Sequence, residues 1–192
     1  NIIMLLSRFA AGIEDGNNIV FFNYAVVLLN VLLTAVILNL NTIVLRRLSI
    51  KKEIRLIFFS VFSSLLLGLG LVALINIYGF EIIQFILQRG AFTLEDTIAT
   101  ADYARDLSIS FVFIFIASSL FQPFFSMEHS LIKKESVWMA RILFFSVIVL
   151  FISFGFLPYT ARENSLIMIY TLSILSLLLS IFSSYKYFIT TI

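Results

Sequence analysis

The 192-residue chain contains no cysteine, only two prolines and a single histidine. Without cysteine there are no disulfides and no thiolate ligands, and one histidine cannot build a metal site alone. Charged residues are also scarce, at 12% against about 25% in an ordinary soluble domain. The sequence offers no paired carboxylates, no nucleophile–base pair and no glycine-rich phosphate loop. We therefore expect no metal, no cofactor and no enzymatic activity.

Hydrophobic residues, by contrast, make up 61% of the chain, and the mean hydropathy is +1.08. An ordinary soluble domain is about 45–50% apolar. This excess of apolar surface is too large to hide inside a chain of this size, so we expect membrane lipids to cover it. The net charge of +2 is too small to suggest a nucleic-acid partner.

Five apolar stretches are long enough to cross a bilayer, which takes roughly 20 helical residues. They cover residues 19–45, 54–78, 107–127, 137–157 and 165–187. Buried strands are shorter, and barrel strands alternate in polarity over about 10 residues. The sequence thus predicts an all-α, polytopic protein in which residues 1–192 form a single transmembrane domain. Residues 1–6 look like the tail of a preceding helix, so we expect an internal fragment whose missing part packs against it.

The linkers alternate in charge, which predicts an orientation. Nine of the 13 Lys and Arg lie near the linkers after the first and third spans and after the fifth span. Eight of the 11 acids lie on the other side. By the positive-inside rule the basic side is cytoplasmic.

The longest linker, residues 79–106, carries helix stop and start signals. Residues 81–89 predict a short helix that continues the second span. Gly90 suits the position just after a helix end. Thr93 can cap the next helix together with Asp96, three residues on.

Several of the few polar residues inside the spans share a helix face. At 100° per residue one face of the first span carries four of them: Asn23, Asn30, Thr34 and Asn41. In the third span Ser119 and Gln122 also share a face. These faces suggest a common polar cavity for a substrate. The alternative is hydrogen bonding between helices without any role in binding.

Small residues recur at four-residue spacing in two spans. They are Ser60, Ser64 and Gly68 in the second and Ser176, Ser180 and Ser184 in the fifth. Such spacing lets helix backbones approach closely, so we expect these faces to pack against other helices.

The long linker also carries a family resemblance. The run Arg89-Gly90-Ala91-Phe92-Thr93, followed by Asp96-Thr97, resembles the "RGAFT..DT" stretch of the MurJ/MviN lipid II flippase family. This family belongs to the multidrug/oligosaccharidyl-lipid/polysaccharide exporter superfamily. Residues 22–25 and 124–126 resemble two further stretches of the family. The resemblance places the chain in the second half of a fourteen-helix transporter. The structural interpretation is favoured for residues 89–97, because a helix stop followed by a helix start explains them without any contact to substrate.

The resemblance implies a function. A MurJ-like protein would move a lipid-linked oligosaccharide across the bacterial inner membrane by alternating access, for peptidoglycan or surface-polysaccharide synthesis. Where the family has an arginine facing the cavity, this chain has Val27, so the expected cation must come from Arg8 or from the missing part. Two alternatives remain open. The chain could belong to an exporter of another amphiphile or drug, or to a scaffold that partners a polysaccharide synthase.

Overall fold

The computed structural model describes residues 16–51, 55–90, 92–125, 129–154 and 160–191. These ranges contain helices and no strand, which confirms the all-α class. The elements are α2 (Gly16–Leu32), the π-helical turn η1 (Leu33–Leu38), α3 (Asn39–Lys51), α4 (Arg55–Leu87), α5 (Leu94–Leu120), α6 (Gln122–Phe125), α7 (His129–Phe154) and α8 (Ala161–Thr191).

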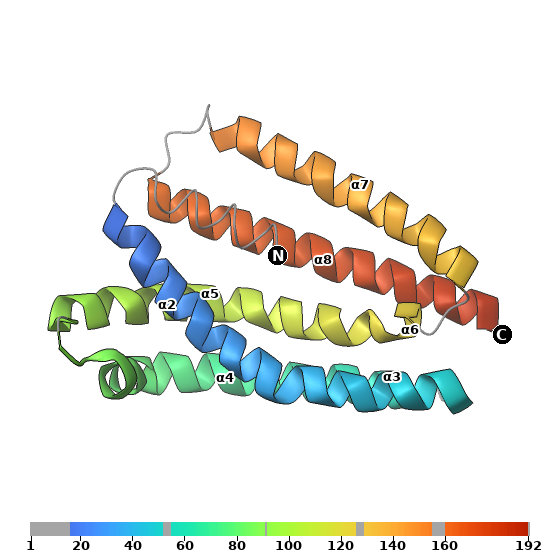
Figure 1. Cartoon of the computed structure of the whole chain (residues 1–192), viewed down its shortest axis with the longest axis horizontal. Coiled ribbons are helices and arrows are strands. Elements are labelled where there is room, and N and C mark those ends of the chain that lie inside the picture. Colours follow the sequence, from blue (N-terminus) through green and yellow to red (C-terminus); the bar gives the residue numbers. More distant parts are fainter. Residues whose placement is uncertain (1–15, 52–54, 91, 126–128, 155–159, 192) are drawn as a thin grey trace.

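The helices run up and down side by side, with α5 at the centre (Figure 1). α5 packs against α4, α8 and α2, whereas α7 packs mainly against α8. The main hydrophobic core joins these central helices through residues such as Phe22, Ile75, Phe111 and Ile169. Because α5 has neighbours on several sides, 61% of its apolar span is buried, against 28% for α4.

Three helices are long and apolar enough to cross a membrane. They are Arg55–Leu87, Leu94–Phe125 and Arg162–Tyr185, and they match the second, third and fifth expected spans. In the expected first span the straight apolar helix is shorter, at Ile19–Val31. The expected fourth span falls mostly within α7, and its last residues lie outside the described ranges. The count of five spans, and the preceding helix tail, therefore stay predictions.

The small residues of α4 pack against other helices as the sequence predicts: Ser60 against α3, and Ser64 and Gly68 against α5. Ser60, Ser64 and Gly68 are all buried. A Cβ atom built on Gly68 would lie 3.1 Å from Cγ1 of Val112 and 3.3 Å from its Cα. This close approach needs a residue without a side chain. On α8, Ser180 and Ser184 are likewise buried, whereas Ser176 is only half-buried. Ser184 donates a hydrogen bond to the carbonyl of Leu120 at 2.6 Å.

The turn between α4 and α5 confirms the stop and start signals. Gly90 adopts a φ of 63°, a left-handed conformation that side chains disfavour. Thr93 caps α5, and Asp96 completes a capping box by accepting from the Thr93 backbone nitrogen at 2.7 Å. The helical part of residues 81–89 continues the second span as expected, because α4 runs unbroken to Leu87. The helix that Thr93 caps, α5, runs unbroken from Leu94 into the third span.

The cap at Thr93 gives a first prediction. Thr93→Ala removes the hydroxyl that accepts from the Asp96 nitrogen, and we expect a loss of about 0.5–2 kcal/mol in the free energy of unfolding. Thermal unfolding of the detergent-purified chain measures this loss. Thr93→Ser keeps the hydroxyl and serves as the control. Equal stability of the alanine and serine variants would contradict the role of the cap.

Candidate functional site

A buried polar cluster joins three helices around Asn41, which is only 3% exposed. The Asn41 amide nitrogen donates to Ser118 Oγ at 3.1 Å. Its carbonyl oxygen accepts from Ser119 Oγ at 3.0 Å and from Ser60 Oγ at 3.4 Å. Ser119 Oγ also lies 2.6 Å from Ser64 Oγ. The cluster thus ties α3 to α4 and α5 through side chains that satisfy one another.

The cluster shows what Asn41 of the first polar face and Ser119 of the second contact in the folded chain. The two faces do meet, since Asn41 bonds directly to Ser119, but they meet as a packed interface rather than across a cavity. Gln122 is buried, and its amide nitrogen donates to the backbone carbonyl of Ser118, four residues earlier in the chain, at 2.8 Å. For Asn41 and Ser119, hydrogen bonding between helices is therefore the observed role. Sequence reasoning did not single out Ser118, although it lies four residues before Gln122 and therefore on the same side of the helix.

The four-residue stripe of the first span does not continue as one face. The turn η1 has i→i+5 hydrogen bonds, so a projection at 100° per residue fails between Leu33 and Leu38. Asn41 joins the buried face after this turn. Asn23 and Asn30 are half-buried, at the border of the face that α2 packs against α5, and Val27 is 53% exposed on the open side.

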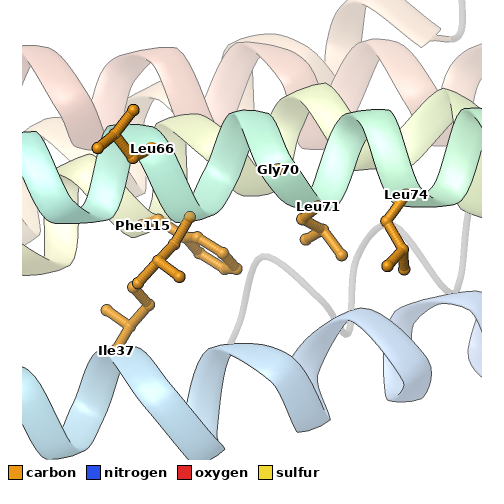
Figure 2. A pocket seen from close by; sticks show the side chains of 7 residues that line it. Ile37, Leu66, Gly70, Leu71, Leu74 and Phe115 are labelled. Carbon is orange, nitrogen blue, oxygen red and sulfur yellow. The ribbon is translucent and has the colours of Figure 1, made fainter.

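Two members of the predicted site lie outside what the structure describes. Arg8 falls in residues 1–15, and the side chain of Thr34 is not described. The space beside the stripe is a groove of about 250 Å³ between η1 and α4, and its lining is apolar (Figure 2). Ile37, Leu71, Leu74 and Phe115 contribute to that lining. None of the described residues that line this groove has a polar side chain that could bind a glycan.

Residues 89–97, which carry the family resemblance, form the turn after the C-terminal end of α4 and the start of α5. Arg89 and Gly90 are exposed, and the Phe92 ring packs edge-on against Tyr24 of α2 at 5.5 Å between centroids. Thr97 is buried and donates to the carbonyl of Thr93 at 3.0 Å. Ala91 lies outside the described residues, as the break in the ranges at 91 shows. Thr93, Asp96 and Thr97 thus act on one another within the helix start.

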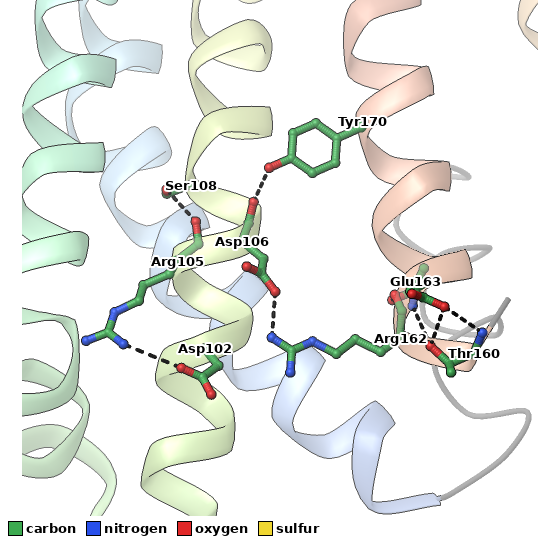
Figure 3. A network of polar contacts seen from close by, with 9 residues as sticks. Asp102, Arg105, Asp106, Ser108, Thr160, Arg162, Glu163 and Tyr170 are labelled. Atoms are coloured by element: carbon green, nitrogen blue, oxygen red, sulfur yellow. Dashed lines mark hydrogen bonds and ion pairs between the residues drawn. The ribbon is translucent and has the colours of Figure 1, made fainter.

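A network of charges at the same end links α5 to α8 (Figure 3). Arg162 of α8 pairs with Asp106 of α5 at 2.6 Å, and its guanidinium lies 5.0 Å above the centre of the Tyr103 ring. Tyr170 donates to the backbone carbonyl of Asp106. Arg105 pairs more loosely with Asp102 at 3.4 Å. Sequence reasoning placed these charges on one side of the membrane but gave no signal for their pairing.

The network positions helices rather than presenting a charge to a ligand. The Arg162 and Asp106 side chains are 43% and 39% exposed, so their pair contributes only about 0–1 kcal/mol. Tyr103 extends the contact, because its ring also meets the Phe22 ring of α2 edge-on at 6.0 Å. Three helices are thereby joined at this end of the bundle.

These features define a class of protein. Three long apolar helices and buried polar contacts between helices characterise a helical membrane protein. Comparisons with known protein families, curated protein sequences and solved structures find no match.

Proposed function

We propose that the chain forms part of a flippase that moves a lipid-linked glycan precursor, similar to lipid II, across the bacterial inner membrane. The observation that carries this proposal is the stretch from Arg89 to Thr97. It resembles a motif of the MurJ/MviN family, and it joins two long apolar helices, α4 and α5, through a glycine turn and a capping box. Transport by alternating access moves helix bundles around a central site and needs no covalent chemistry.

The open side of α2 is the proposed substrate path. Val27 and Val31 lie on it and are 53% and 57% exposed, with Asn23 and Asn30 at its border. Amides at such a border can hydrogen-bond a sugar. An anionic pyrophosphate also needs a cation, and α2 contains no charged residue. We assign that cation to Arg8 or to another part of the transporter.

A second candidate, a scaffold that partners a polysaccharide synthase, is favoured by the sealed interface around Asn41. A scaffold needs interfaces rather than a cavity, and this cluster leaves no room for a substrate. The exporter of another amphiphile differs from the flippase only in its substrate, and the same transport assay separates the two.

The test uses flipping of a labelled lipid-linked glycan in vesicles that contain the full transporter. We expect the double variant Asn30→Leu, Thr34→Leu to slow flipping by roughly thirtyfold, because two lost hydrogen bonds at about 1 kcal/mol each remove about 2 kcal/mol. Membrane insertion should persist, since leucine is favourable inside a span. Ile152→Leu, at an exposed position on α7 and therefore off the proposed path, is the control. Full activity of the double variant would remove these residues from the path and favour the scaffold.

A further inference from the structure

The groove lies between η1 and α4, and side chains of both elements line it (Figure 2). Phe115 of α5 lines it together with Ile37 and Leu71. Gly70 also lines it, and a Cβ atom built there would meet nothing within 4 Å. This glycine therefore keeps space open, in contrast to Gly68, which allows a helix contact.

The groove lies at the end of an exposed stripe on α4. The stripe consists of Arg55, Phe59, Phe62, Leu66 and Gly70, all of which are exposed. Their spacing of i, i+4, i+7, i+11 and i+15 puts them on one side of the helix. One exposed surface thus runs from a charged helix end to the apolar groove.

The length of this stripe matches the depth of one leaflet. Gly70 lies about 22 Å along the helix axis from Arg55, at 1.5 Å per residue. The hydrocarbon core is about 30 Å thick, and the headgroup regions extend the bilayer to about 40–45 Å. When Arg55 lies among the headgroups, the groove lies near the middle of the bilayer. Hydrocarbon, rather than water, surrounds it there.

The charged end of the stripe carries cations without acidic partners. Arg47 of α3 and Arg55 of α4 are exposed, and the structure gives neither of them an ion pair within the described ranges. They lie at the same end of the bundle, because α3 and α4 pack there through Leu48 and Ile57. Arginines at this level attract anionic lipids.

We propose that this surface binds one anionic glycerophospholipid from the leaflet at the Arg55 end. Its phosphate contacts Arg55 and Arg47. One acyl chain follows Phe59 and Leu66 along α4, and the end of that chain fills the groove at Gly70. The charge selects the headgroup, while the groove selects a chain long enough to reach it. This lipid is distinct from any transported substrate.

The first experiment tests the headgroup. The full-length protein in detergent is titrated with long-chain phosphatidylglycerol and, separately, with zwitterionic phosphatidylcholine. We expect Arg55→Gln to weaken phosphatidylglycerol binding about fivefold and to leave phosphatidylcholine unchanged. Arg141→Gln, which removes an exposed charge from α7, should have no effect. Equal affinity of the wild type for both lipids, or an unchanged affinity in Arg55→Gln, would overturn the proposal.

The second experiment tests the groove. Gly70→Leu fills it, and excluding even one or two methylene groups should weaken long-chain phosphatidylglycerol binding about tenfold. A short-chain phosphatidylglycerol, which cannot reach the groove, should bind the variant as it binds the wild type. Ala73→Leu, at an exposed position on α4, is the matched control. Unchanged binding of long-chain phosphatidylglycerol to Gly70→Leu would refute the role of the groove. The wild type is also titrated with polyprenyl phosphate. If it binds this lipid about tenfold more tightly than phosphatidylglycerol, the groove belongs to the transported lipid instead.

Discussion

Replacing Gly68 with leucine should destabilise the protein by about 1–3 kcal/mol, the range for overpacking a well-packed interface. The Cβ alone would lie 3.1–3.3 Å from Val112, and one of the atoms it meets is the Val112 Cα, which cannot rotate away. The remaining atoms of leucine would have to separate α4 from α5. Thermal unfolding of the purified chain in detergent measures the effect.

Gly70, two residues along the same helix, provides the matched control. It is exposed, and nothing lies within 4 Å of the position of its Cβ. Leucine is also a better helix former than glycine, by up to about 1 kcal/mol. Gly70→Leu should therefore unfold at the same temperature as the wild type or slightly higher. If both leucine variants lose equal stability, the α4–α5 contact at Gly68 is not as close as described.

Removing the Asn41 side chain should also be costly. Asn41→Ala deprives the Ser60, Ser118 and Ser119 hydroxyls of their shared partner, and we expect a loss of about 1–3 kcal/mol in unfolding free energy. Single hydrogen bonds between membrane helices contribute about 0.6 kcal/mol on average, so three bonds together fall in this range.

Asn39 tests whether the effect belongs to the cluster. It is exposed and bonds only to the carbonyl of Ala35, four residues earlier in η1, so Asn39→Ala should change stability by less than about 0.5 kcal/mol. A double-mutant cycle of Asn41→Ala with Ser119→Ala should show coupling of at least about 0.5 kcal/mol. Additive effects in that cycle would mean that the hydrogen bond between the two residues does not stabilise the fold.

Local signals predicted the parts of the fold that depend on neighbouring residues. The spacing of Ser60, Ser64 and Gly68 identified the buried face of α4, because four-residue spacing in a regular helix fixes a face whatever packs against it. Gly90, Thr93 and Asp96 identified the turn for the same reason. A glycine with positive φ and a capping box are complete within seven residues.

Predictions that assumed a regular helix over a long distance did not hold. The stripe from Asn23 to Asn41 spans η1, and no feature of residues 33–38 announced a π-helical turn. The pairing of Arg162 with Asp106 joins residues 56 apart, and a single sequence carries no signal for such a contact.

Because α7 makes few contacts with the other helices, it should separate from the bundle more readily than α5 does. α7 contacts its neighbours through Met139, which clusters with Leu179, and through Trp138, whose ring lies 5.3 Å from Phe182. Phe145 and Val149, further along the helix, are 64% and 62% exposed. A segment with few buried contacts separates from the rest at a small fraction of the global unfolding free energy. Amide protons of α7 should therefore exchange with solvent deuterium through partial opening, while those at the centre of α5 exchange only when the whole bundle unfolds.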